Sequence, residues 1–116
     1  MNLLTPTLKD QLLGNWRAND EAGLDSPDFQ PVVKLFAPDA RATWLLTELN
    51  PADEDIVFGL CDLGQGEPEL GYVSLQELKT VRGRLGLPIE RDLHFEPDKT
   101  LSQYAELARQ ARRIVT

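Results

Sequence analysis

The stretch FGLCDLGQGEPELGYVSLQEL, residues 58–78, decides the fold of this chain. Apolar residues before Asp62 and after Glu69 predict two strands, joined by a glycine-rich acidic loop. The S-x-x-E pattern of Ser74 and Glu77 is typical of a capping box and predicts that a helix begins there. The rest of the chain must supply the elements that pair with these strands and pack on them.

The apolar pattern predicts four strands, at residues 32–37, 42–49, 56–63 and 70–73. Each connection between them is at most about six residues, which is too short for a parallel crossover, so the strands should form an antiparallel meander. A symmetric hairpin about residues 50–55 places Thr43 opposite Asp62 and Glu48 opposite Val57. Both faces of that hairpin are then largely apolar, which favours helices, or a curl of the sheet, on both sides.

Three helices are also predicted. The first begins at Thr5-Pro6, and a polar loop at residues 19–31 follows it. The second runs from Ser74 to Gly86 with Leu75, Leu78, Val81 and Leu85 facing the core, and the third spans residues 101–115 behind a capping box of Thr100 and Gln103. With a short edge strand at residues 89–95, the chain is a single α+β domain over residues 1–116, of four strands or five.

Length and composition exclude several classes of protein. The 116 residues fit one domain, and no run approaches the ~18 apolar residues of a membrane span. The N-terminus lacks a signal-peptide pattern, so we expect a cytoplasmic protein with no membrane contact. The single cysteine, Cys61, excludes an internal disulfide framework and gives no metal-ligand pattern, and no cofactor is expected.

The charge is uneven along the chain. Residues 1–78 hold 4 basic and 14 acidic residues, a net charge of −10, whereas residues 79–116 carry a net charge of +3. The total of −7 argues against direct nucleic-acid binding. The asymmetry reflects either two solvated faces of one domain or an acidic face offered to a basic protein partner. Oligomeric state stays open, because an edge strand at residues 89–95 could pair between chains.

Nucleophilic catalysis is disfavoured. His94 is the only histidine, Cys61 lies in an apolar strand, and Ser74 is used as a helix cap. Gly64-Gln65-Gly66 lacks the lysine of a phosphate loop and has an acidic rim. The tail arginines are explained by the dipole of the last helix in preference to nucleic-acid binding.

Two sets of polar residues leave alternatives open. Glu48, Asp62 and Glu69 could converge as ligands of a metal-dependent hydrolase, or could point separately into solvent. Glu90-Arg91-Asp92 is either a structural salt-bridge network or a site in which Arg91 binds an anion. Trp44 and Tyr72 could form an aromatic wall near such a site, although aromatic residues in strands more often belong to the core.

An ordered set of short motifs spans most of residues 3–95: Leu3-Leu4-Thr5, Val33-Lys34-Leu35-Phe36, Thr43-Trp44, Thr47-Glu48, Phe58-Gly59, Glu69 with Gly71-Tyr72, Ser74-Leu75 with Glu77-Leu78, Gly86-Leu87 and Ile89-Glu90-Arg91-Asp92-Leu93. In these motifs the chain resembles the small bacterial family catalogued as domain of unknown function 2958. That resemblance implies an origin on plasmids or integrated elements and supplies no established activity or catalytic residue.

If the family has a common site, the resemblance places it among Thr43, Glu48, Glu69, Tyr72, Glu90, Arg91 and Asp92. The family often has a different aromatic residue at the position of His94, which argues against His94 as a general base. The sequence therefore favours a non-enzymatic interaction module, one version of which is an acidic DNA mimic that occupies the basic groove of a defence nuclease. A small metal-dependent hydrolase is the alternative.

Overall fold

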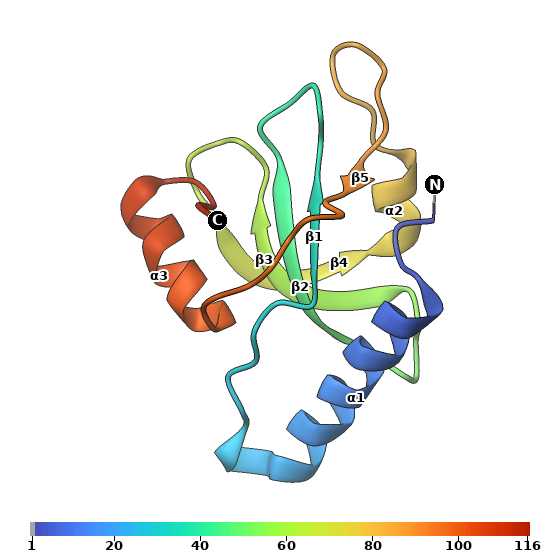
Figure 1. The fold of residues 1–116 in the computed structure, drawn as a ribbon, viewed down its shortest axis with the longest axis vertical. Coiled ribbons are helices and arrows are strands. Elements are labelled where there is room, and N and C mark those ends of the chain that lie inside the picture. Colours follow the sequence, from blue (N-terminus) through green and yellow to red (C-terminus); the bar gives the residue numbers. More distant parts are fainter. Residues whose placement is uncertain (1) are drawn as a thin grey trace.

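A five-stranded antiparallel sheet forms the centre of the molecule, with the strands in the order β4-β3-β2-β1-β5 (Figure 1). The computed structural model describes residues 2–116. The elements are α1 (Pro6–Ala22), the 3-10 helix η1 (Gly23–Asp25), β1 (Val33–Phe36), β2 (Thr43–Leu49), β3 (Ile56–Asp62), β4 (Glu69–Ser74), α2 (Leu75–Thr80), β5 (Glu90–Arg91) and α3 (Leu101–Ala111). This arrangement confirms the α+β fold and the meander. None of the described helices has the length and apolar character needed to cross a membrane.

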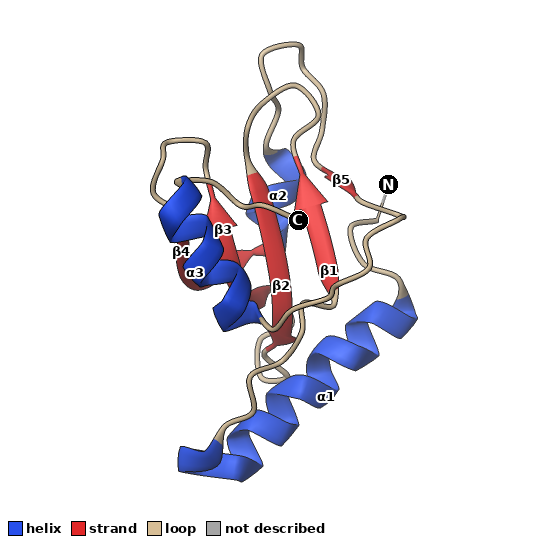
Figure 2. Cartoon of the chain, turned by 60° about the vertical axis from the view of Figure 1, so that its left-hand side comes forward, coloured by secondary structure: helices blue, strands red, loops and turns tan. Residues whose placement is uncertain are grey.

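Helices pack on both faces of the sheet, and Figure 2 shows α3 in front of it and α2 behind it. We call the side covered by α1 and α2 the α1 face, and the opposite side the α3 face. The buried core of the α1 face consists of Leu3, Leu12, Val33, Leu35, Trp44, Leu46, Leu49, Val57, Leu78 and Ile89. The buried core of the α3 face consists of Leu45, Leu60, Leu101, Tyr104 and Ala108.

The pairing of β2 with β3 follows the predicted register over Thr43–Leu46 and departs from it afterwards. Glu48 lies opposite Phe58, one residue away from its predicted partner, because a β-bulge between Leu46 and Glu48 inserts an extra residue into β2. Side chains alternate between the faces of a strand, so this shift moves Glu48 to the α3 face and Leu49 to the α1 face.

The first helix is longer than predicted. Thr5 caps it as expected, since the Thr5 hydroxyl accepts a hydrogen bond of 3.2 Å from the Leu8 N–H. The helix then continues through Ala22 and η1 to Asp25, so the predicted loop at residues 19–31 begins too early. Residues 19–22 contain neither glycine nor proline, and polar side chains on an exposed helix cost little.

The second helix is shorter than predicted. Ser74 caps α2, but the helix ends at Thr80, and Val81 and Leu85 are exposed instead of buried. The segment after it folds back onto the β1–β2 turn, where the Asp39 carboxylate accepts hydrogen bonds from the backbone N–H groups of Leu85 (2.7 Å) and Leu87 (3.3 Å). A contact with a residue more than 40 positions away therefore overrides the apolar helix pattern.

The last two elements are also shorter than their predictions. β5 pairs with β1 and contains only two residues, and Leu93, predicted to lie within it, is exposed. The capping box at Thr100 and Gln103 is confirmed, but α3 ends at Ala111 and not at residue 115. Arg112 adopts the left-handed conformation (φ 60°) that commonly terminates helices.

Candidate functional site

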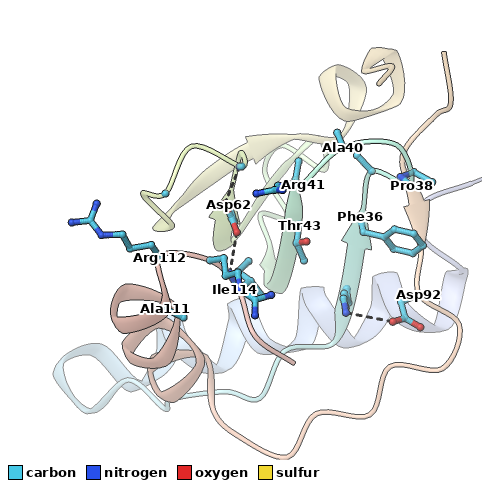
Figure 3. Close-up of a pocket in the computed structure, with 16 residues that line it drawn as sticks. Phe36, Pro38, Ala40, Arg41, Thr43, Asp62, Asp92, Ala111, Arg112 and Ile114 are labelled. Carbon is cyan, nitrogen blue, oxygen red and sulfur yellow. Dashed lines mark hydrogen bonds and ion pairs between the residues drawn. The ribbon is translucent and has the colours of Figure 1, made fainter. Parts of the chain in front are cut away.

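A cleft of about 940 Å³ lies on the α3 face, beside the C-terminal end of α3 (Figure 3). Its floor includes a row of three cross-strand neighbours, Phe36 on β1, Thr43 on β2 and Asp62 on β3. Lys34 and Asp92 extend this floor toward β5. The core of α3 covers the β2 and β3 part of this face, which leaves the floor toward β1 and β5 uncovered.

Three segments that are distant in the sequence form the walls of this cleft. The β1–β2 turn contributes Arg41, the β3–β4 loop contributes Gly64 and Gly66, and the chain after α3 contributes residues 112–114. The loop packs closely on the turn, because a Cβ atom at Gly64 would lie 3.1 Å from the Cβ of Arg41. The walls are therefore held in place by contacts between the segments themselves.

Asp62 joins two of these walls to the sheet. Its carboxylate is buried, and one oxygen accepts a hydrogen bond of 2.8 Å from the Gly64 N–H. The other accepts one of 2.9 Å from the Ile114 N–H. Hydrogen bonds to a charged acceptor are stronger than neutral ones, so Asp62 acts first as a structural anchor for the loop and the C-terminal segment.

Asp92 and Lys34 neutralise one another at the β5 end of the cleft. The Lys34 ammonium lies 3.6 Å from a carboxylate oxygen of Asp92 and donates a hydrogen bond of 2.7 Å to the Thr116 hydroxyl. The second carboxylate oxygen of Asp92 accepts a hydrogen bond of 2.9 Å from the backbone N–H of His94. These contacts fix the side chains at the edge of the sheet.

The structure gathers only part of the predicted site. Thr43, Asp62 and Asp92 line the cleft together. Trp44 is buried in the core of the α1 face, which agrees with a structural role. Glu69 pairs with Cys61 and so lies on the α1 face, whereas Asp62, the next residue along β3, faces the opposite side.

Arg91 does not form the expected salt-bridge network with its two acidic neighbours. Its guanidinium donates hydrogen bonds to the backbone carbonyls of Asn2 (3.0 Å) and Leu3 (2.9 Å) and so holds the N-terminal segment against β5. Within residues 2–116, no carboxylate forms an ion pair with Arg91. Glu90 is exposed beside a smaller cavity on the same edge of the sheet.

Glu48 and Tyr72 lie in a second row on the α3 face, on either side of Phe58. The Phe58 and Tyr72 rings are tilted with centroids 5.0 Å apart, and the Trp16 ring lies 6.5 Å from that of Tyr72. Tyr72 is largely exposed, whereas Glu48 is buried. Burial raises the pKa of the Glu48 carboxyl because desolvation penalises its charged form.

These positions do not support the hydrolase alternative. Glu48 and Asp62 share the α3 face, but Glu48 lies opposite Phe58, which is four residues before Asp62 on β3. The two carboxylates are therefore on the order of 13 Å apart along the strand. Glu69 faces the other side. Across the described part of the chain, no three His, Cys, Asp or Glu side chains come together as a group that could hold a metal ion.

The candidate nucleophiles are also separated from the histidine. Cys61 lies on β3 and His94 follows β5, with β2 and β1 between them in the sheet. The Ser74 hydroxyl donates a hydrogen bond to the Asp55 carboxylate and caps α2. Burial, followed by the nearby negative charge of Glu69, raises the pKa of the Cys61 thiol to about 11.

Cys61 should therefore react slowly with iodoacetamide. At pH ~7.5 a thiol of pKa about 11 holds far less thiolate than an unfolded thiol of pKa ~8.5, and although a more basic thiolate is more nucleophilic, native alkylation should be slower by at least about tenfold. Mass spectrometry of native and urea-unfolded protein measures this ratio, and Glu69→Gln should raise the native rate. Equal native and unfolded rates would show that the fold does not suppress the thiolate.

The sequence did not reveal the basic part of the cleft. Lys34, Arg41, Arg112 and Arg113 come from a strand, a turn and the segment after the last helix, and no local motif connects them. The only signals were the net positive charge of residues 79–116 and the arginines at the end of the last helix, which the helix dipole also explains. Gly64 and Gly66 likewise border a wall that contains Arg41, a neighbour that the acidic loop sequence did not predict.

Comparison with known proteins agrees with the motifs noted in the sequence. Residues 3–115 match a family model described as protein of unknown function (DUF2958). No curated protein and no solved structure matches the chain. The match covers nearly the whole chain, including every strand, every helix and the cleft. The chain therefore belongs to the DUF2958 family of proteins of unknown function.

Proposed function

We propose that the protein is a non-enzymatic interaction module that binds a basic protein partner through an acidic surface at the α1 end of the molecule. We call this surface the acidic end. It consists of exposed carboxylates on α1, on η1 and in the β2–β3 turn: Asp10, Asp20, Glu21, Asp25, Asp53 and Glu54. The observation that carries the proposal is this gathering of carboxylates from two parts of the chain.

One contact brings the two parts together. The Lys9 ammonium on α1 lies 2.7 Å from a Glu54 carboxylate oxygen in the β2–β3 turn, so the turn lies against the helix. Residues 6–28 and 50–55 hold eight acidic residues and only two basic ones. Residues 10–25 extend on the order of 20 Å along α1 and η1, so these carboxylates form an elongated acidic surface whose field attracts a partner of opposite charge.

An exposed apolar side chain lies at one end of this surface. Leu24 on η1 is fully exposed, between Glu21 and Asp25 in the sequence. In an interface, a few buried apolar contacts supply affinity, and charged residues near them supply steering and specificity. This favours a protein partner over a simple counter-ion.

The specific version of this proposal is an acidic DNA mimic of mobile-element origin, acting in the cytoplasm on a DNA-processing enzyme. Its carboxylates would occupy the groove in which that enzyme binds phosphates. Purified DNA nucleases should then bind the protein with a Kd that rises steeply as salt increases from about 50 to about 500 mM, and duplex DNA should compete.

A charge-matched pair of variants tests the surface. The triple variant Asp20→Asn, Glu21→Gln and Asp25→Asn should weaken nuclease binding by at least about tenfold, because exposed charges at an interface mainly raise the rate of association. Glu67→Gln combined with Glu90→Gln and Glu96→Gln removes the same charge elsewhere and should change binding by less than about threefold. Salt-independent complexes, no complexes, or equal losses in both variants would reject the proposal.

A further inference from the structure

The cleft on the α3 face concentrates positive charge in a protein whose net charge is −7. Four cationic side chains line it, Lys34, Arg41, Arg112 and Arg113, against two carboxylates, Asp62 and Asp92. A local excess of one sign, opposite to that of the whole molecule, focuses attraction on this hollow and not on the general surface. The cleft therefore differs in charge from the acidic end, and it calls for a different ligand.

Both carboxylates of the cleft are already engaged. Asp62 accepts two backbone N–H groups, and Asp92 pairs with Lys34. In the part of the chain that the structure describes, Arg41, Arg112 and Arg113 form no ion pair. The Lys34 charge is thus balanced by Asp92, whereas the three guanidinium groups share the single carboxylate of Asp62, so the cleft keeps an excess of positive charge.

The positions of the arginines define which part of the cleft attracts an anion. Figure 3 shows Arg41 beside Thr43 and Asp62, whereas the Arg112 side chain extends away from them. Arg113 also lines the cleft, and its backbone is held near the floor because the N–H of the next residue, Ile114, donates a hydrogen bond to Asp62. Arg41, Arg113 and the Thr43 hydroxyl are thus the donors best placed for an anionic group.

Phe36 supplies a different kind of surface. Its partly exposed ring lies on the floor next to Thr43, because the two residues are cross-strand partners, and Figure 3 shows it on the β5 side of the cleft. Aromatic side chains stack on planar rings such as nucleobases. A cleft of this volume falls in the range of small-molecule sites.

We propose that this cleft binds a nucleoside phosphate, with its phosphate groups on Arg41, Arg113 and Thr43 and its base against Phe36. Guanidinium groups bind phosphate oxygens in a bidentate manner, and a phosphate carries more charge and more acceptor oxygens than a carboxylate. The flat ring next to Thr43, on the β5 side of the cleft, favours a nucleotide over inorganic phosphate alone. The site is separate from the acidic end, so either proposal can fail without the other.

Calorimetric titration of the full chain with ADP, pyrophosphate and adenosine tests this assignment. ADP and pyrophosphate should both bind saturably, and adenosine at least about tenfold more weakly than ADP, because the charge-assisted hydrogen bonds go to the phosphates. In nitrogen-15 spectra, ADP should shift the backbone amide signals of Thr43, Gly64 and Gly66. Absence of saturable binding by both phosphate ligands would overturn the proposal.

Three variants locate the ligand. Arg41→Gln and Arg113→Gln should each weaken the binding of both phosphate ligands by at least about tenfold. Arg17 is an exposed arginine on α1, and Arg17→Gln should change their binding by less than about twofold. Phe36→Leu should weaken the binding of ADP by about fivefold or more and leave the binding of pyrophosphate unchanged.

Other results would contradict particular parts of the assignment. If the control variant Arg17→Gln weakens binding as much as Arg41→Gln, the attraction is a general surface effect and the cleft is not the site. If Phe36→Leu leaves ADP binding unchanged, the nucleotide class is wrong. If a single-stranded oligonucleotide binds more tightly than ADP, the ligand of the cleft is a nucleic acid and not a small nucleotide.

Discussion

Replacing Gly59 by alanine should lower the free energy of unfolding by about 3 kcal/mol or more. Gly59 lies in the middle of β3, paired with Leu46 of β2 next to the bulge. A Cβ atom there would lie 2.9 Å from the Cα of Leu46 and still closer to the Leu45 carbonyl oxygen. Both contacts are with backbone of a central strand, which cannot move without disturbing the sheet on either side, so the strain stays.

The neighbouring strand provides a matched control. Gly71 of β4 is the cross-strand partner of Gly59, and a Cβ atom at Gly71 would meet nothing within 4 Å. Gly71→Ala adds the same methyl group in the same row and should change stability by less than about 1 kcal/mol. Urea denaturation of the two variants measures the difference, and similar free energies for both would contradict the close approach of β2 to Gly59.

Replacing Asp62 by alanine should destabilise the protein by about 3 kcal/mol and release the chain after α3. The variant loses two charge-assisted hydrogen bonds and leaves the N–H groups of Gly64 and Ile114 without their acceptors. Because Asp62 is only 2% exposed, water cannot fully replace the carboxylate. The loss should appear both in urea denaturation and as faster hydrogen exchange at the Ile114 amide.

Two further variants separate the anchor from a general charge effect. Asp62→Asn keeps one acceptor oxygen and should lose roughly half as much stability as Asp62→Ala. Glu67→Gln removes a charge from the exposed β3–β4 loop and should change stability by less than about 0.5 kcal/mol. An Asp62→Ala variant that stays fully stable, with the Ile114 amide still protected, would show that Asp62 does not hold the C-terminal segment.

Local sequence signals determined the elements and their order. The Thr5 cap and the box of Thr100 and Gln103 act within four residues, so helix starts could be read directly. Short connections likewise predicted the antiparallel meander, and symmetric closure of the hairpin about residues 50–55 predicted the register of β2 with β3 over Thr43–Leu46. In each case the residues that interact are close in sequence or follow a strict period.

Tertiary contacts decided where these elements stop. The apolar spacing of Leu75, Leu78, Val81 and Leu85 fits a long helix, but Asp39 binds the backbone N–H of Leu85 and the helix ends five residues earlier, at Thr80. In the same region, a side chain at Gly83 would overlap the Asp39 carboxylate. The spacing of residues along the sequence does not identify such a distant partner.

The bulge in β2 has a similar origin. Leu46 and Glu48, on either side of the bulge, are both compatible with an alternation of side chains between the two faces. The sequence pattern therefore did not reveal the extra residue. The Asn15 side chain on α1 donates a hydrogen bond of 2.9 Å to the Thr47 carbonyl and holds the bulged backbone against the helix. The bulge turns Glu48 to the α3 face, away from Glu69 on the α1 face, and on the order of 13 Å along the strand from Asp62.

By itself, then, the sequence determined the fold class, the family and the acidic character of residues 1–78, because composition, caps and short-range periodicity are local properties. Only the tertiary structure decided which side chains share a surface. It separated Glu48, Asp62 and Glu69, and it brought Arg41 and Arg113 to one cleft from positions more than 70 residues apart. Convergence of this kind depends on how strands and loops cross in space, and no spacing along the chain contains that information.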